Sequence, residues 1–511
     1  MSAPTNLRTT SLLLSLTLFA GCAVNPVTGR SEFAITSASK ELEIGKLQYG
    51  PSQQSQGGKF TADETLVEYV SEVGQRLAAV SKRSLPYEFV IINDSVPNAW
   101  ALPGGKIAVN RGLLLELSNE SELAAVLGHE VVHAAARHGA QAMDRGMLLQ
   151  GGLLLTSIAV HESEFANEIV GGAKTGLQLI SHKYGRDAER ESDIYGIEYM
   201  VDAGYDPVGA VTLQETFVRL SGERRKDFLE GLFASHPPSA ERVDNNRKKA
   251  AEYPPGGELG EVRFREKTDF LRRTKPAYSA FDQSASLATV DTDAALAAID
   301  RAIGLLPTEP RFHGRRGDIL MLRQKYTAAD EAFSAALEMD DSYYEYYLGK
   351  GLANSQLGNR REARTLLDRA NELLPTAVAM SELGKLSLVD GRRSDAKQYF
   401  RAAARAGGQV GREATSAFIR LDLPDDPTQY IVAEAIATNG QVFAVVTNRS
   451  PLPLREVRIV FRAIANGEAI TRAVSMTSLA AGERTRATAG WQFQQSDVVT
   501  EISARVAGAT L

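Results

Sequence analysis

Residues 129–133 combine two histidines and a glutamate in the order HEVVH. On a helix, side chains four positions apart project from one face, so the imidazoles of His129 and His133 can reach a single metal ion. Glu130 lies about 100 degrees round the helix from His129, where its carboxylate can take a proton from a zinc-bound water without binding the metal. The pattern predicts a hydrolytic zinc site with two histidine ligands and a glutamate base.

The alternative is a core helix that happens to carry polar residues. The chain has only seven histidines among 511 residues, so a chance match to this pattern is rare. A buried helix also has no use for an unpaired glutamate, because burying such a group is costly. The zinc site is therefore the favoured interpretation.

A catalytic zinc ion needs a third protein ligand and an open fourth position. The metzincin pattern would supply a third histidine a little further along the same segment. It requires glycine and histidine at two positions where this chain has Ala136 and Gly139, and His138 lies one residue short. The third ligand must therefore come from elsewhere in the chain.

Residues 181–196, SHKYGRDAERESDIYG, offer carboxylates for this role. Glu189 and Asp193 are four positions apart on a predicted helix and so face the same way. One of them can bind zinc while the other accepts a hydrogen bond from the ring N–H of a ligand histidine. Glu191 faces a different direction and remains an alternative ligand.

The elements that must position these residues are mainly helical. Residues 61–82 predict an amphipathic helix, because a capping box of Thr61 and Glu64 precedes apolar residues at helical spacing. Residues 87–93, YEFVIIN, predict a strand. Residues 98–114, NAWALPGGKIAVNRGLL, predict a strand, a Pro-Gly-Gly turn, a second strand and the start of a helix.

Further along, the chain repeats at offsets of 34, 34 and 33 residues. One column of the repeat is small and another is bulky: Ala302, Ala336, Ala370 and Ala403, and Ile299, Phe333, Leu367 and Phe400. A small residue lets two helices approach and a bulky one fills the gap, as in stacked helix-turn-helix repeats. A chance alignment of alanines is disfavoured, because several columns agree. Residues 289–408 resemble a tetratricopeptide array of about three repeats.

From about residue 425 the hydrophobic pattern changes from helical to alternating. Short predicted strands are joined by Asn-Gly, Asn-Arg-Ser and Ala-Gly-Glu turns, spaced as in an antiparallel sandwich. The order of these segments resembles the small immunoglobulin-like FxLYD-type domains of bacterial envelope proteins.

The first 21 residues are typical of an export signal. Arg8 precedes an apolar run at residues 11–20 that is too short to span a bilayer. The run ends in LFAGC, and Cys22 is the only cysteine, so a disulfide framework is excluded. The segment resembles a bacterial lipobox, which predicts cleavage before Cys22 and lipidation of that residue. Ala23 stands where Asp would favour inner-membrane retention, so anchoring to the outer membrane is expected. The alternative is a free cysteine after an ordinary signal peptide.

Four segments, in this order and spacing, resemble the gluzincin metallopeptidases of the HtpX and CAAX-prenyl-protease type: NAWALPGGKIAVNRGLL, HEVVHAAARHG, RDAERESD and SHPPSAERV. Together with the lipobox and the repeats, they are most similar to the BepA-like envelope metalloproteases, which contain tetratricopeptide repeats. The resemblance implies one zinc ion per chain, bound by His129, His133 and Glu189. It also implies that Glu130 is the base and that Asp193 supports a ligand histidine.

The same resemblance implies that Asn98, Ala99, Trp100 and Ala101 belong to an edge strand beside the cleft, where backbone groups can pair with an extended substrate. His236, in the SHPP segment, matches a family position near the metal. There it would stabilise the oxyanion or occupy the open site and hold the enzyme latent. The alternative is that His236 is a helix-capping loop residue.

Two departures from the family pattern stand out. Membrane-embedded relatives carry transmembrane helices between the two zinc motifs, whereas here only the short, glycine-interrupted hydrophobic stretch 147–160 remains. The carboxy-terminal sandwich is also not a standard part of the BepA-like pattern. His138, His161 and His182 are interpreted as structural or surface residues.

The sequence thus predicts a multidomain protein. We expect a signal peptide (1–21), a lipidated tether (22–31), a mainly α zincin metalloprotease domain with a small β-sheet (32–252), a linker (253–288), an α-solenoid of tetratricopeptide repeats (289–408) and an immunoglobulin-like β-sandwich (425–511).

The predicted function is that of a zinc metalloendopeptidase of the bacterial periplasm, anchored by lipid to the outer membrane. Its expected substrates are misfolded or misassembled envelope proteins, with the repeats binding clients or the outer-membrane protein assembly machinery. The rival hypothesis is a lipid-anchored scaffold or chaperone with a latent metal site. The chain has 57 basic and 63 acidic residues, a net charge of −6, which disfavours nucleic acid as a partner.

Overall fold

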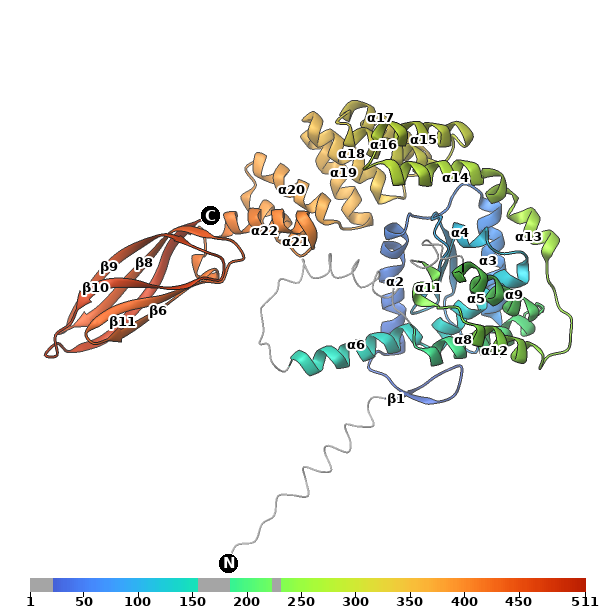
Figure 1. Cartoon of the computed structure of the whole chain (residues 1–511), viewed down its shortest axis with the longest axis horizontal. Coiled ribbons are helices and arrows are strands. Elements are labelled where there is room, and N and C mark those ends of the chain that lie inside the picture. The colour runs from blue at the N-terminus through green and yellow to red at the C-terminus, as the bar shows by residue number, and fades with distance from the viewer. Residues whose placement is uncertain (1–21, 155–183, 223–230) are drawn as a thin grey trace, which may run out of the picture. The chain divides into compact units, whose positions relative to one another are not determined.

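The computed structural model describes residues 22–154, 184–222 and 231–511. The chain divides into two compact units, Met1–Pro375 and Thr376–Leu511 (Figure 1). The predicted signal peptide, His161, His182 and the second part of the hydrophobic stretch 147–160 lie outside the described residues. Within the described ranges, no helix has the length and apolar character needed to cross a bilayer.

The first unit begins with a mainly helical region that contains two small sheets. Its strands are β1 (Cys22–Val24), β2 (Ser31–Phe33), β3 (Glu88–Ile92), β4 (Ala99–Leu102) and β5 (Lys106–Asn110). Its helices are α2 (Ala38–Ser55), α3 (Glu64–Ala79), α4 (Arg111–Leu114), α5 (Glu120–Ala135), α6 (His138–Leu154), α8 (Arg186–Asp202), α9 (Val208–Gly222), α11 (Leu232–Ser235), α12 (Ala240–Ala250), α13 (Glu261–Lys267) and α14 (Asp269–Leu287). Helix hairpins follow: α15 (Thr292–Leu305), α16 (Pro310–Leu322), α17 (Tyr326–Met339), α18 (Tyr344–Leu357) and α19 (Arg360–Leu373).

Helix α3 forms where the apolar periodicity predicted a helix, and its apolar stripe is buried in the main core. The predicted capping box of Thr61 and Glu64 is wrong. The helix is capped instead by Asp63, whose carboxylate accepts hydrogen bonds from the backbone N–H groups of Thr65 (3.1 Å) and Leu66 (3.3 Å). The aspartate stands immediately before the first turn, so its short side chain reaches the free N–H groups first.

The predicted strand, turn, strand and helix between residues 98 and 114 are all present. The strand order is β3-β5-β4, with β3 parallel and β4 antiparallel to β5, so β4 lies at the edge of the sheet. Gly104 and Gly105 form the turn between β4 and β5 with φ values of 80° and 82°. Residues with a Cβ rarely adopt this backbone conformation, which explains why both positions are glycine.

Helix α5, which carries the HEVVH segment, is buried along almost its whole length. It packs against α8 through two glycines, Gly128 and Gly196. A Cβ on Gly128 would lie 3.2 Å from the carbonyl oxygen of Gly196, and a Cβ on Gly196 would lie 3.2 Å from the backbone nitrogen of His129. This close approach allows short side chains on the two helices to meet.

Helix α2 packs closely on the turn between β4 and β5, since a Cβ on Gly45 would lie only 1.9 Å from the carbonyl oxygen of Pro103. We expect Gly45→Ala to destabilise the first unit by about 1–3 kcal/mol, because overpacking outweighs the better helix propensity of alanine. Thermal unfolding of the whole protein measures this as a lower Tm. The control is Gly304→Ala in α15, where no described atom beyond the adjacent residues of the same helix lies within 4 Å of the new Cβ. Equal effects of the two substitutions would contradict the close packing.

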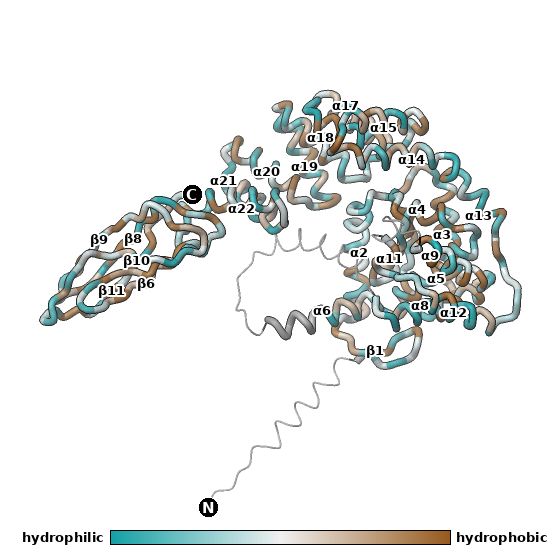
Figure 2. Tube along the Cα trace, viewed as in Figure 1, coloured by the Kyte–Doolittle hydropathy of each residue, from teal (hydrophilic) through white to brown (hydrophobic). Residues whose placement is uncertain are grey.

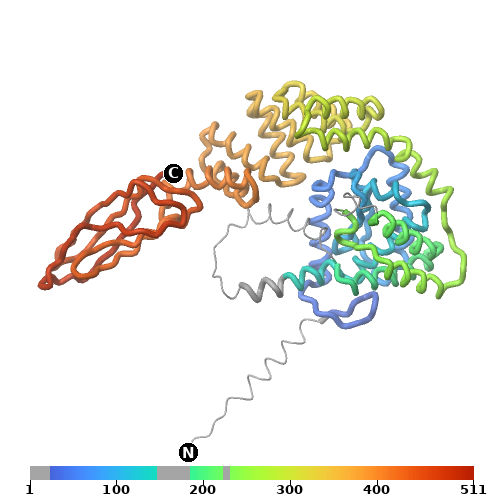
Figure 3. The backbone as a smooth tube through the Cα atoms, in the orientation of Figure 1, coloured from blue at the N-terminus to red at the C-terminus, as the bar shows by residue number. Residues whose placement is uncertain are grey.

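Two segments predicted as connectors are folded. The predicted linker 253–288 contains α13 and α14, which bury Phe264, Leu271 and Tyr278. These residues recur every seven positions, so they form one apolar stripe on helical segments. Arg263 of α13 also pairs with Glu72 of α3 at 2.9 Å, and Figure 3 shows these distant parts of the chain side by side. The predicted tether 22–31 contains β1 and the first residue of β2, and the two strands pair antiparallel.

The repeat columns are buried as predicted. The alanines of the small column are fully buried and the bulky column is at most 2% exposed. In the neighbouring helices, the bulky residues contact glycines: Phe333 lies against Gly317 and Gly349, and Leu367 lies against Gly351. The division between the two units falls after Pro375, within the predicted array.

The second unit contains helices α20 (Ala377–Val389), α21 (Arg393–Ala403) and α22 (Gly408–Asp422), a short 3-10 helix η1 (Pro427–Gln429) and six strands in the described chain. The strands are β6 (Ile431–Thr438), β7 (Gln441–Asn448), β8 (Leu454–Ala465), β9 (Glu468–Leu479), β10 (Arg484–Gln492) and β11 (Val499–Thr510).

These strands form two antiparallel sheets, ordered β10-β7-β6 and β11-β8-β9. Burial alternates along β7, and residues from both sheets share one apolar core. Figure 2 shows hydrophobic and hydrophilic residues interspersed along these strands. Asn439-Gly440 and Asn466-Gly467 connect successive strands, and all four residues have positive φ. The predicted alternating strands and their Asn-Gly turn are therefore present.

Candidate metal centre

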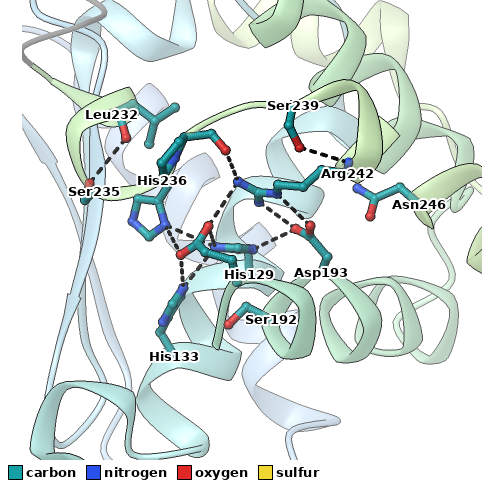
Figure 4. Close-up of polar contacts among 12 residues, drawn as sticks. His129, His133, Ser192, Asp193, Leu232, Ser235, His236, Ser239, Arg242 and Asn246 are labelled. Atoms are coloured by element: carbon teal, nitrogen blue, oxygen red, sulfur yellow. Dashed lines mark hydrogen bonds and ion pairs between the residues drawn. The ribbon is translucent and has the colours of Figure 1, made fainter. Parts of the chain in front are cut away.

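Four potential metal ligands from three parts of the first unit meet at one point. His129 and His133 lie on α5, Glu189 lies on α8, and His236 follows α11 directly. The ligand atoms of these residues all lie within 4.8 Å of one another. Figure 4 shows the three imidazoles pointing toward a common centre.

The donor set fits a zinc ion. His129 Nε2 lies 3.0 Å from His133 Nε2 and 3.2 Å from His236 Nδ1. Two imidazole nitrogens can hydrogen-bond only when one carries a proton, so three converging nitrogens favour a shared cation. Glu189 Oε1 completes the group, 2.9 Å from His236 Nδ1 and 3.4 Å from His133 Nε2. Nitrogen and carboxylate oxygen donors are typical of zinc sites.

His133 is in the protonation state that metal binding requires. Burial is the largest influence on this residue and lowers the pKa of its imidazole well below the ordinary value. The ring is therefore neutral, with a nitrogen lone pair available for a metal ion.

Glu130 lies beside this group. It is 1% exposed, and its Oε1 lies 3.6 Å from His236 Nε2. Its Oε2 has no hydrogen-bond partner among the described residues. Burial raises the pKa of Glu130, although the neighbouring histidines oppose that change. A carboxylate with a free oxygen and a raised pKa is suited to accept and release a proton during a reaction.

Asp193 contacts the Nδ1 side of the His129 ring, and Arg242 in turn binds Asp193. Asp193 Oδ1 lies 3.1 Å from His129 Nδ1. Arg242 donates to both oxygens of Asp193, at 2.7 and 2.8 Å, and its Nη1 lies 3.0 Å from Glu189 Oε2. Burial acts to raise the pKa of Asp193, but the charge and hydrogen bonds of Arg242 outweigh burial and hold that pKa below its ordinary value. The charged Asp193 favours the tautomer of His129 with its proton on Nδ1, which leaves Nε2 for a metal.

His133 is supported from its other side. His138 Nδ1 lies 2.9 Å from His133 Nδ1, and the ring of Tyr184 lies 4.0 Å from that of His133, between ring centres. Glu191, the alternative ligand, contacts His138 and Asn25. Its Oε1 lies 3.4 Å from His138 Nε2 and accepts a hydrogen bond from Asn25 at 2.9 Å. The structure therefore places Glu191 outside the four-residue group.

The segment predicted to bind substrate lies on edge strand β4 or just before it: Asn98 is half-buried, and Ala99, Trp100 and Ala101 are buried. The side chain of Trp100 is held by a hydrogen bond to Gln56 at 3.1 Å. The backbone N–H of Leu232 donates to Pro97 O at 3.0 Å, which connects this segment to the helix preceding His236.

A cavity opens beside Glu130. It is lined by His129, His236 and Arg242 and by apolar side chains of α5, α8, α9 and α11, among them Ala125, Val126, Met200, Leu213, Phe217 and Leu232. Its volume of about 30 Å³ leaves room for one or two water molecules next to the candidate base.

Sequence reasoning missed three residues that contact the centre, namely Arg242, His138 and Tyr184. Arg242 is part of the SHPPSAERV segment, but a single arginine on an exposed-looking helix gives no local sign of burial. His138 was interpreted as structural, and only the packing of α6 against α5 shows that it supports His133.

Comparison with known proteins adds independent findings. Residues 64–250 match the model of peptidase family M48. The chain is 31% identical over 261 residues to the mitochondrial metalloendopeptidase OMA1 of Schizosaccharomyces pombe, which covers 50% of this chain and 73% of that protein. It is 28% identical over 239 residues to the beta-barrel assembly-enhancing protease of Yersinia pestis, which covers 45% of this chain and 48% of that protein.

The alignment thus spans about half the length of the Yersinia relative. Among solved structures, the first TPR of Spaghetti (RPAP3) bound to an HSP90 peptide matches 23% of this chain and 95% of its own, at 22% identity and a TM-score of 0.23.

Proposed function

Because this chain belongs to peptidase family M48, we propose that it is a zinc-dependent endopeptidase in which His129, His133 and Glu189 bind the metal. The observation that supports this most directly is the convergence of these ligands beside Glu130, a buried glutamate whose Oε2 has no hydrogen-bond partner in the described part of the chain. When bound, zinc would polarise a peptide carbonyl and acidify a water molecule.

The residues of the chain supply the remaining steps. Glu130 takes the proton from the attacking water and delivers it to the leaving amine, for which its raised pKa is suited. Asp193 and Arg242 fix the orientation of His129. Asn98, Ala99, Trp100 and Ala101 lie on or just before β4, the edge strand of its sheet, whose backbone is proposed to pair with an extended peptide.

Removing the metal tests this function. We expect 1,10-phenanthroline to abolish casein cleavage or self-cleavage by the purified protein, and added zinc to restore it, because the ligands then lack their cation. Bound zinc is measured in parallel by mass spectrometry. Cleavage that persists in fully zinc-free protein would rule out the proposal. Bound zinc without cleavage in both the parent protein and His236→Ala would favour the rival function, a lipid-anchored scaffold or chaperone.

We propose that His236 holds the enzyme latent. Its Nδ1 lies 3.2 Å from His129 Nε2 and 2.9 Å from Glu189, so it would take the fourth position on a bound zinc ion, which a catalytic zinc site keeps open. We expect His236→Ala to cleave casein faster than the parent protein, with unchanged zinc content. The matched control is Ser235→Ala, the neighbouring buried residue, whose hydroxyl donates to Leu232 O. Slower cleavage by His236→Ala would show instead that His236 assists the reaction.

For the rest of the chain, we propose that Cys22 carries lipid after cleavage of residues 1–21, and that the protein is periplasmic and held at the outer membrane. The helix hairpins are proposed to be tetratricopeptide repeats that bind client proteins or the outer-membrane assembly machinery. We propose misassembled outer-membrane proteins as the substrates; the name of the Yersinia relative, beta-barrel assembly-enhancing protease, supports a role in β-barrel assembly. The paired sheets of the second unit are proposed to be an immunoglobulin-like domain.

A further inference from the structure

The hairpin of β1 and β2 exposes its apolar side chains. Val24 is 59% exposed, Phe33 is 47% exposed, and Ile35, two residues beyond Phe33, is 52% exposed. Exposure alternates along residues 31–36, with the odd positions outward. Val24 pairs with Ser31, and paired residues on neighbouring strands lie on the same face, so Val24, Phe33 and Ile35 share the outward face.

The opposite face of the hairpin carries Ala23, Glu32 and Ala34, which are half-buried against the protein. Asn25 is 1% exposed and donates to Glu32 at 3.0 Å and to Glu191 at 2.9 Å. The backbone N–H of Val27, itself buried in the main core, donates to Asn25 Oδ1 at 2.9 Å. These contacts hold the hairpin in one orientation.

The segment after the hairpin is fixed as well. The hydroxyl of Thr36 donates to the buried carboxylate of Asp144 at 2.6 Å, and the backbone N–H of Ile35 donates to the same carboxylate at 2.9 Å. Ile35 therefore cannot turn inward without breaking a buried hydrogen bond, which is costly.

This arrangement departs from the usual pattern of a surface hairpin. A sheet with one face toward water normally places apolar residues inward and polar residues outward. Single exposed apolar side chains are common, but several on one face of a fixed element mark a surface that meets an apolar partner.

The position of the hairpin in the chain indicates a lipid bilayer as that partner. The apolar run at residues 11–20 ends two positions before Cys22, and the backbone of Cys22 pairs with that of Phe33. If Cys22 carries lipid, or if the apolar run stays attached, acyl chains or apolar residues would enter the membrane beside Phe33.

We propose that the outward face formed by Val24, Phe33 and Ile35 lies in the surface layer of the bilayer. The opposite face then fixes the direction of the metal centre, because Asn25 binds Glu191 on α8, the helix that also carries Glu189 and Asp193. The hairpin would thus hold the metal centre in a fixed orientation at the membrane surface. This goes beyond the proposed peptidase activity and does not depend on it.

The test uses the full-length protein from a bacterial membrane fraction, reconstituted in phosphatidylethanolamine and phosphatidylglycerol vesicles. Phe33→Cys and Ile35→Cys are labelled separately with a nitrobenzoxadiazole fluorophore. The matched control is Val290→Cys, because Val290 is an apolar residue that is 83% exposed, far along the chain. We expect blue-shifted emission, several-fold weaker quenching by aqueous iodide and strong quenching by spin-labelled lipid at positions 33 and 35, compared with position 290.

Equal iodide quenching at all three positions would overturn the proposal. Protection from iodide without quenching by spin-labelled lipid would also overturn it, since a second copy of the chain would then cover the face. The unsubstituted protein reports separately on Cys22, its only cysteine, because a lipidated thiol takes up no label. If Cys22 is labelled, the same comparison is made in a Cys22→Ser background, and protein that fails to float with the vesicles counts against the proposal.

Discussion

Glu130→Gln is expected to lower kcat/KM for casein by about 10²- to 10⁴-fold, the usual contribution of a general base. Glutamine has the shape of glutamate but cannot accept the proton of the attacking water. Bound zinc should stay unchanged, because Glu130 does not belong to the four-residue group of ligands. The measurement combines cleavage kinetics with the zinc content of the same samples.

Thermal stability separates this effect from misfolding. Burial raises the pKa of Glu130 in the folded protein, so its charged form opposes folding near neutral pH. The Tm of Glu130→Gln should therefore equal or exceed that of the parent protein. The control is Glu122→Gln on the same helix, a buried glutamate that accepts hydrogen bonds from Ser118 and Thr212. If Glu130→Gln retained full activity, Glu130 would not be the base.

Arg242→Met is expected to produce the largest loss of stability. The guanidinium pairs with Asp193 at 2.7 Å and with Glu189 at 3.0 Å, and its removal leaves two buried carboxylates without their cation. Breaking a buried ion pair in this way costs about 3–5 kcal/mol. Zinc affinity should also fall by about 10- to 100-fold, because Asp193 no longer holds His129 in place. Thermal unfolding and zinc titration measure the two effects.

The matched control is Arg247→Met on the same helix, α12. The side chain of Arg247 is 57% exposed, and its pairs with Glu215 and Asp244 lie at the surface, so its loss should change Tm little. Arg242→Lys should rescue only part of the loss, since lysine cannot donate two parallel hydrogen bonds to Asp193. Equal Tm values for the two methionine variants would contradict the role of Arg242.

The difference in stability between the parent protein and Arg242→Met should also depend on pH. The folded pKa of Asp193 lies below its unfolded value, so the pair stabilises the fold above the unfolded pKa, about 3.9. The stability gap between the parent protein and Arg242→Met should therefore shrink as pH falls through the folded pKa. A gap that grew on acidification would show that Asp193 is not the main partner of Arg242.

The sequence by itself determined the features that depend on short-range geometry. The spacing of His129 and His133 places both imidazoles on one face of any helix, and Glu130 necessarily lies between them. The same rule placed Glu189 and Asp193 on one face of α8. The repeat columns and the strands of the second unit also follow from local periodicity, which tertiary contacts reinforce and do not create.

Only the tertiary structure decided which groups from distant segments meet. The contact of Gly128 with Gly196 brings α8 against α5, so that Glu189 faces the histidines while Glu191 faces Asn25. The burial of Arg242, the support of His133 by His138 and the outward apolar face of the β1–β2 hairpin likewise have no local signal. Each depends on how one element packs on another, and the side-chain pattern of a single segment does not contain that information.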